Sequence, residues 1–122
     1  MTEILLINPN TTPSITDLVL KTARSCASEG TTLRAVTGAF GPRYIASRVG
    51  YAIAGHAAVD AFANDQGHKD AVVLACFGDP GLDALREIAN VPVVGMADAS
   101  ILQACALGRR FSIVTGGERW KP

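Results

Sequence analysis

Short apolar runs alternate with longer amphipathic stretches along the whole chain. Residues 4–7, 71–75, 91–95 and 111–115 are almost continuously apolar, whereas residues 32–36 alternate between apolar and polar positions. Continuous runs of this length are typical of strands buried on both faces of a parallel sheet, and alternation is typical of a more exposed strand. The pattern therefore predicts five strands, with residues 32–36 at an edge.

Between these runs, apolar residues recur at the three- and four-residue spacing of helices. The first helix is predicted to have Thr12 as its N-cap and Pro13 as its first residue. Further helices are predicted around residues 51–62, 82–88 and 97–105. This alternation of strands and helices predicts an α/β fold: an open, mostly parallel sheet with helices on both faces and right-handed crossovers.

Composition narrows the functional classes. The chain has 122 residues, enough for one modest domain, and its 11 basic and 11 acidic side chains give no excess of positive charge for nucleic acid. A hydrophobic content of 48% excludes a disordered chain. No apolar run approaches the roughly 20 residues of a membrane span, and no secretory signal is recognisable, so we expect a cytoplasmic protein with no membrane partner. Three scattered cysteines and two histidines predict free thiols and no metal site.

Cys76 directly follows the third strand, at the expected carboxyl edge of the sheet. Open α/β sheets bind their ligands at this edge. We expect Asp79 to be the N-cap of the next helix and Pro80 its first residue, so that the helix N-terminus favours the thiolate of Cys76. Cys26 and Cys105 fall on apolar helical faces and are predicted to be core residues. Cys76 should therefore be the most reactive of the three thiols.

The sequence resembles the Asp/Glu/hydantoin racemase superfamily, and within it the hydantoin and allantoin racemases. The resemblance rests on segments that span nearly the whole chain in order, among which Cys-Phe-Gly-Asp-Pro-Gly is the most specific. They are residues 7–12, 41–42, 75–82, 92–95 and 111–115. The resemblance implies two similar α/β domains, each of which contributes one cysteine to the cleft between them. One thiolate removes the proton from the stereogenic carbon and the opposite thiol returns a proton, without metal, pyridoxal phosphate or other cofactor.

For this chain, the resemblance implies a flavodoxin-like first domain at residues 1–110 and the start of a second domain at residues 111–122. Cys76 matches the cysteine of the first domain, and the second family cysteine would lie after Pro122. We therefore expect about half of a racemase that acts on 5-substituted hydantoins by two-cysteine proton transfer, and we expect this half to be inactive alone. The expected partners are a small-molecule substrate, a hydantoin or related cyclic ureide, and further copies of the chain in a homo-oligomer.

Seven residues are predicted to form the site, with Cys76 as the catalytic group. The backbone amides that follow Cys76 would hold the developing enolate oxygen, and Gly78 would allow a close approach of the substrate. Asn10 would bind the imide ring or orient the thiol. Phe77 and Ile45 would form apolar walls, and Ile45 lies in a stretch without periodicity that is typical of a binding loop or lid. The substrate-binding candidates are Asn10, Ile45, Phe77, Gly78, Asp79 and Thr115.

Each assignment has an alternative. Asp79 could serve only as a cap, Asn10 only as a turn residue, Thr115 only as a strand end and Cys76 only as a core residue. A relative that processes aspartate, glutamate or maleate is a second enzymatic interpretation, although such sites usually offer cationic or hydroxyl groups. A non-enzymatic flavodoxin-like binding module is a third, because residues 10–14 open a helix after a strand, where phosphate binds. That loop contains no glycine, which weakens the third interpretation.

Overall fold

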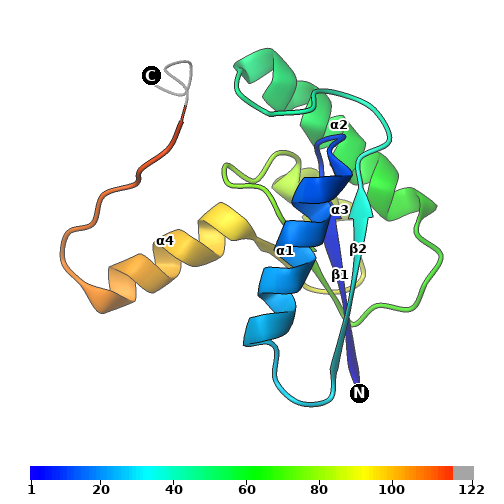
Figure 1. Cartoon of the computed structure of the whole chain (residues 1–122), viewed down its shortest axis with the longest axis horizontal. Helices are drawn as coiled ribbons and strands as arrows, with labels where there is room; N and C mark the ends of the chain where they lie inside the picture. Colours follow the sequence, from blue (N-terminus) through cyan, green and yellow to red (C-terminus); the bar gives the residue numbers. More distant parts are fainter. Residues whose placement is uncertain (117–122) are drawn as a thin grey trace.

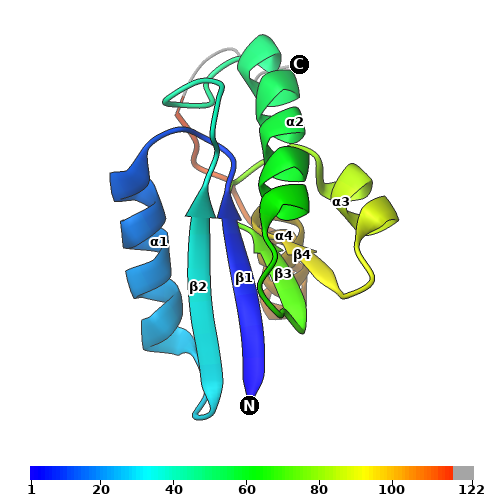
Figure 2. The same cartoon turned by 90° about the vertical axis from the view of Figure 1, so that its right-hand side faces the viewer.

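A four-stranded parallel sheet in the order β2-β1-β3-β4 forms the centre of the molecule (Figures 1 and 2). The structure is a computed structural model that describes residues 1–116. Strands and helices alternate along this part of the chain, as the pattern predicted. They are β1 (Thr2–Asn8), α1 (Pro13–Cys26), β2 (Thr31–Thr37), α2 (Arg48–Asn64), β3 (Ala71–Leu74), α3 (Leu82–Ile88), β4 (Val93–Gly95) and α4 (Met96–Leu107).

All neighbouring strands run in the same direction, so their carboxyl ends meet at one edge of the sheet. Asn8 at the end of β1 is opposite Thr37 at the end of β2, and Ile7 is opposite Leu74 of β3. The prediction that β2 lies at a sheet edge is confirmed. This register brings the loops after β1 and β3 to adjacent positions, which is the arrangement that the predicted site requires.

The main hydrophobic core lies between the sheet and the helices α2 and α3. Alternate residues of β1 and β3 point to this face, as the two-residue period of strands requires. Small alanines of α2 allow the helix to approach the sheet closely, and all of these core residues are nearly inaccessible to solvent. Its buried members are Leu5, Ile7, Ala58, Val72, Leu74, Leu82, Leu85 and Val93. The opposite face of the sheet is covered in part by α1, so helices lie on both faces (Figure 2).

The predicted fifth strand is wrong. Residues 111–115 form no strand in the structure, and Phe111, Ile113 and Val114 are exposed. An apolar run becomes a strand only where another strand offers hydrogen-bonding partners, and α4 carries this segment away from the sheet (Figure 1). Residues 117–122, the remainder of the predicted second domain, lie outside the described part of the chain.

The two helical cysteines were also predicted wrongly, because both Cys26 and Cys105 are exposed. The face of α1 that turns toward the protein buries Thr16, while Leu18 is exposed. In α4 only Ala97 is buried. Apolar spacing alone therefore identified the helices correctly but did not show how much of each helix the rest of the molecule covers.

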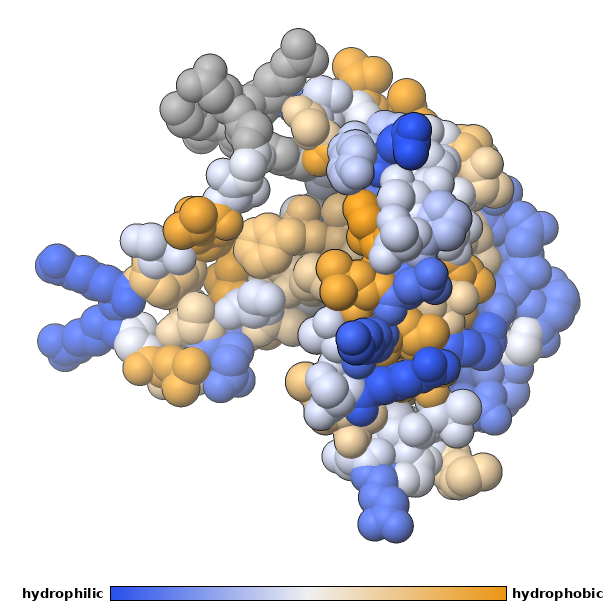
Figure 3. Space-filling model, in the orientation of Figure 1, coloured by the Kyte–Doolittle hydropathy of each residue, from blue (hydrophilic) through white to orange (hydrophobic). Residues whose placement is uncertain are grey.

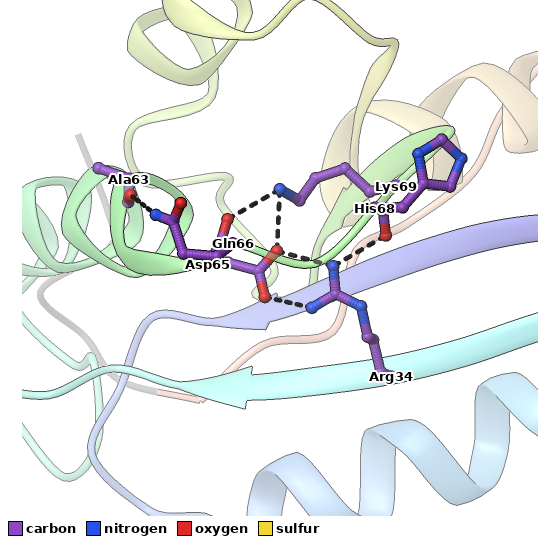
Figure 4. Close-up of polar contacts among 6 residues, drawn as sticks. All are labelled: Arg34, Ala63, Asp65, Gln66, His68 and Lys69. Atoms are coloured by element: carbon purple, nitrogen blue, oxygen red, sulfur yellow. Dashed lines mark hydrogen bonds and ion pairs between the residues drawn. The ribbon is translucent and has the colours of Figure 1, made fainter.

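An ion-pair cluster links β2 to the loop between α2 and β3 (Figure 4). The Arg34 guanidinium donates to both carboxylate oxygens of Asp65, and Lys69 Nζ lies 2.8 Å from Asp65 Oδ2. Arg34 Nη2 also donates to the His68 carbonyl at 3.0 Å. The hydrogen bonds from Arg34 and Lys69 lower the pKa of Asp65 to about 2.

Candidate active site

Cys76 lies two residues after the last residue of β3, at the carboxyl edge of the sheet, where the sequence predicted it. Its side chain is half-buried, and its Sγ atom lies 3.8 Å from the Phe77 carbonyl oxygen. Burial, together with the nearby negative charge of Asp79, raises the pKa of the Cys76 thiol to about 11. The expectation that a helix N-terminus stabilises the thiolate is therefore wrong: the surroundings favour the protonated thiol.

The turn after Cys76 also differs from the prediction. Helix α3 begins only at Leu82, and its N-cap is Gly81 in the left-handed conformation, so the predicted capping role of Asp79 and helical role of Pro80 are both wrong. The turn is closed by a 3.1 Å hydrogen bond from the Asp79 amide to the Cys76 carbonyl. Gly78 has a φ of +107°, a conformation that favours glycine, as the sequence anticipated. Helix α3 thus begins two residues later in the chain than predicted.

Asp79 caps a different helix. Its carboxylate accepts hydrogen bonds from the backbone amides of Ala97 at 2.9 Å and Asp98 at 2.7 Å, at the start of α4. Gly95 leaves room for this contact, because a Cβ atom there would lie 2.4 Å from Asp79 Oδ2. Asp79 therefore joins the Cys76 turn to α4, a link across 18 residues that local spacing cannot reveal.

Two backbone donors in the turn remain available. The amides of Phe77 and Gly78 make no hydrogen bond to any atom of residues 1–116, whereas the Asp79 amide is used within the turn. Two of the three amides that the sequence suggested for an enolate oxygen are thus free to bind a ligand. Contact of either amide with substrate stays a prediction.

The loop between β1 and α1 supplies Asn10, which is only 8% exposed. Its Oδ1 accepts hydrogen bonds from the Thr12 amide at 2.9 Å and from Asn8 Nδ2 at 2.8 Å. Its Nδ2 has no hydrogen-bond partner among the described residues. Thr12 occupies the predicted N-cap position, but its hydroxyl donates to the Arg43 carbonyl at 2.7 Å instead of capping α1. Asn10 is therefore held firmly while its N–H groups stay available.

Four predicted site residues line one cavity of about 280 Å³: Ile45, Phe77, Gly78 and Thr115, together with Gly116. Ile45 belongs to the loop between β2 and α2, which is fastened to the β1–α1 loop by the Thr11 amide donating to the Pro42 carbonyl at 3.2 Å. This loop is thus a fixed wall of the cavity rather than a free lid. Asn10, Cys76 and Asp79 do not line it, although Cys76 immediately precedes Phe77.

A larger apolar hollow of about 550 Å³ adjoins this cavity through Phe77 (Figure 3). It lies between α4, which contributes Ile101 and Ala104, and the extended segment 111–116. Figure 3 shows apolar side chains, in orange and tan, over the left-hand part of the molecule. The candidate site is therefore open on the side of α4.

Tyr51 of α2 is a neighbour of the site that sequence reasoning missed. Its hydroxyl donates to the Asp79 carbonyl at 3.4 Å, and burial together with the charges of Asp79 and Cys76 raises its pKa. The sequence placed Tyr51 only on the apolar face of a helix, and no local signal connected it with the Cys76 turn. Within residues 1–116, no three His, Cys, Asp or Glu side chains are grouped so that they could hold a metal ion, and no helix there is long and apolar enough to cross a membrane.

Comparison with known proteins gives one consistent result. The model of the Asp/Glu/hydantoin racemase family matches residues 4–122. Hydantoin racemase from Paenarthrobacter aurescens is 38% identical over 115 residues, which cover 93% of this chain and 49% of that protein. Hydantoin racemase from a Pseudomonas strain is 39% identical over 114 residues, or 93% of this chain and 46% of that protein. The crystal structure of allantoin racemase from Pseudomonas fluorescens superposes with a TM-score of 0.94 at 36% identity, covering 97% of this chain and 50% of that one. The chain thus spans about half the length of the relatives it matches.

Proposed function

The chain belongs to the Asp/Glu/hydantoin racemase family, and from this premise we propose that it forms one wall of the active site of a racemase for 5-substituted hydantoins or related cyclic ureides. The observation that carries the proposal is the position of Cys76 beside a small cavity that is lined by Ile45, Phe77, Gly78 and Thr115. The names of the similar proteins, hydantoin racemase and allantoin racemase, support this class of substrate.

Cys76 would act as the acid on one face of the stereogenic carbon. With a pKa of about 11, its resting form near neutral pH is the thiol. A base on the opposite face removes the C5 proton, and the electron pair of the C–H bond moves into the adjacent carbonyl to form an enolate. As the enolate collapses, C5 takes the Cys76 proton on the other face and leaves a thiolate. For the other enantiomer the thiolate is the base, so the same residue serves both directions, and no step needs a cofactor.

The base on the opposite face is proposed to be a second cysteine. Neither Cys26 nor Cys105 lines the cavity, and both are exposed on helices, so neither is a suitable partner. The partner would come from the part of the whole protein that faces the open side of the site. Residues 1–122 alone would then not racemise hydantoins at an appreciable rate, because proton transfer on both faces requires both groups in place.

The remaining site residues would bind the substrate. The free amides of Phe77 and Gly78, and the Nδ2 atom of Asn10, would donate to the enolate oxygen as charge develops on it. Ile45 and Phe77 would contact the C5 substituent, and the Thr115 hydroxyl would bind a polar edge of the ring. Asp79 would act mainly by shaping the turn, because both of its carboxylate oxygens already accept hydrogen bonds from α4.

The lining of the cavity favours a ring ureide over an amino acid. Its described lining contains no cationic side chain, only Ile45, Phe77, Gly78, Thr115 and Gly116. A dicarboxylate such as aspartate or glutamate would need positive charge to replace its lost hydration. A neutral hydantoin needs only hydrogen bonds and an apolar wall, and both are present.

The test uses the whole gene product that contains this chain. Optical rotation of an enantiopure 5-substituted hydantoin measures racemisation, and proton NMR in deuterium oxide measures exchange at C5. Cys76→Ser should abolish racemisation, because a serine hydroxyl is far too weak an acid, while exchange on one enantiomer can persist through the opposite base. Cys26→Ser, at an exposed position on α1, should retain the original rate. Racemisation by Cys76→Ser at the original rate would refute the assignment.

A further inference from the structure

We propose that Asn8 is a positioning residue that fixes the side-chain amide of Asn10, so that the Asn10 N–H groups face the candidate site. The inference rests on the proposed function, in which Asn10 binds the substrate. Asn8 is not expected to touch the substrate, because it is only 2% exposed. Its effect would pass entirely through Asn10.

Asn8 lies at the end of β1, and both polar atoms of its side-chain amide form hydrogen bonds. Its Nδ2 donates to Asn10 Oδ1 at 2.8 Å and to Thr16 Oγ1 at 3.0 Å, and its Oδ1 accepts from the Asn10 backbone amide at 3.2 Å. The Thr16 hydroxyl continues the network to Thr37 Oγ1 on the neighbouring strand, 2.7 Å away. These bonds attach the β1–α1 loop to the buried end of the sheet.

The network allows only one orientation of the Asn10 amide. Both donors that reach this side chain, Asn8 Nδ2 and the Thr12 backbone amide, require the carbonyl oxygen of Asn10 on their side. A flipped Asn10 would set its NH2 group against two other N–H donors, and each lost bond in a buried site carries a desolvation cost. The Asn10 Nδ2 must therefore point away from the network, where no atom of residues 1–116 accepts its hydrogens.

The sheet register places the loop that contains Asn10 next to the turn that contains Cys76. Ile7 pairs with Leu74, so Asn8 at the end of β1 lies beside Ala75, the residue that follows β3. The loop that begins at Asn8 and the turn that begins at Cys76 therefore leave the same edge of the sheet on adjacent strands. An amide donor that is unpartnered, little exposed and fixed in orientation at this edge is suited to a carbonyl oxygen of the substrate.

A double-mutant cycle on the whole gene product tests the kinetic consequence. Asn10→Ala and Asn8→Ala should each lower kcat/KM for a 5-substituted hydantoin by about 10-fold, the effect of one hydrogen bond to a developing charge. In the Asn10→Ala background, the Asn8 substitution should have little further effect, because the residue through which it acts is gone. Effects that multiply in the double variant would overturn the proposal.

Thr16→Val is the matched control. It removes another bond of Asn8 within the same buried network but leaves the contact with Asn10 in place. Thr16→Val should lower the free energy of unfolding by about as much as the loss of one buried hydrogen bond does. Its kcat/KM should stay within about twofold of the value for the original protein. An equal loss of kcat/KM in Thr16→Val would indicate a purely structural network. If Asn8→Ala does not fold, Asn8→Ser, which is too short to reach Asn10 Oδ1, takes its place in every comparison.

A second measurement does not depend on turnover. Nitrogen-15 relaxation of the Asn10 side-chain amide reports its motion on the picosecond-to-nanosecond scale. The group should be rigid in the original protein and in Thr16→Val, and mobile in Asn8→Ala or Asn8→Ser. A rigid Asn10 amide in the Asn8 variants would overturn the inference. If hydantoins are not racemised at all, the proposed function fails, whereas this relaxation result still decides whether Asn8 positions Asn10.

Discussion

Cys76 combines a position at the candidate site with a thiol that resists ionisation. Its burial and the charge of Asp79 both oppose the thiolate and raise the pKa to about 11. A raised pKa is consistent with the proposed racemisation, because that reaction needs one group that starts as acid while the opposite group starts as base. The environment of Cys76 favours the protonated form that the proposed acid role requires.

Alkylation of the three cysteines tests this resting state. At pH 8, Cys76 should react with iodoacetamide more slowly than Cys26 and Cys105, because the thiolate is the reactive form and the other two thiols are exposed. The Cys76 rate should rise with pH until the thiol ionises near pH 11. Peptide mass spectrometry after brief labelling measures each site. Preferential labelling of Cys76 at pH 8 would show that its thiolate is stabilised after all.

The sequence correctly placed Cys76 at the end of a buried strand but predicted the wrong sign for its pKa shift. The position of Cys76 could be predicted because the apolar run before it is a local feature of one strand. The pKa depends on burial and on the charge of Asp79, whose carboxylate is held by α4, far along the chain. The side chains of Cys26 and Cys105 show the same limit, because their exposure depends on what covers α1 and α4.

At the level of elements, Asp79 is the main connection between the Cys76 turn and α4. Asp79→Ala should lower the free energy of unfolding by about 1 kcal/mol, since it removes a side-chain cap from two amides of the helix. Asp83→Ala is the control: Asp83 is an exposed acidic residue in the first turn of α3, and its loss should cost only a few tenths of a kcal/mol. Urea unfolding measures both. Equal losses would mean that the Asp79 bonds contribute nothing specific.

The cluster around Asp65 predicts a loss of stability in acid (Figure 4). The Asp65 pKa is lowered to about 2 in the folded protein, so its stabilising contribution is complete above the unfolded value near 4 and disappears as the pH falls toward 2. The contribution is on the order of 1–2 kcal/mol, because the carboxylate is largely shielded from water. Asp65→Asn should therefore be less stable than the original chain at pH 6 and equally stable near pH 2.

Urea unfolding at several pH values provides the comparison. Asp17→Asn, at an exposed position on α1, should change stability little at any pH. A difference between Asp65→Asn and the original chain that persists unchanged from pH 6 to pH 2 would show that packing, rather than charge, links β2 to the α2–β3 loop.

The elements themselves were largely predictable because each carries its own periodicity. The four observed strands and four described helices coincide with predicted segments. The exception, residues 111–115, has the apolar content of a strand but no neighbouring strand to pair with. Strand formation is a property of pairs, so a single sequence segment cannot establish it.

At the level of the whole molecule, the site is assembled from loops that are distant in sequence. Register alone brings the β1–α1 loop and the Cys76 turn to one edge, and backbone hydrogen bonds add the loop that contains Ile45. Thr115, in the extended segment that follows α4 in the sequence, completes the lining of the cavity. The sequence could select these residues only through family resemblance, because no local pattern relates Ile45 to Thr115. Their roles, the proposed domain boundary near residue 110 and the homo-oligomer stay predictions.

The arm formed by α4 and the following segment predicts self-association of the 122-residue chain. Helix α4 extends away from the sheet (Figure 1), and Leu102, Leu107 and Val114 are 66%, 79% and 97% exposed. Apolar side chains gathered around a hollow of about 550 Å³ form the kind of surface that proteins usually cover with a partner. A second copy of the chain is always present in solution, so we expect oligomers whose fraction rises with protein concentration.

Light scattering across a dilution series measures these oligomers. Leu102→Glu should shift the population toward monomer, whereas Leu18→Glu, at a similarly exposed apolar position on α1, should not. A monomer at every concentration, or equal effects of the two substitutions, would contradict an interface at this arm.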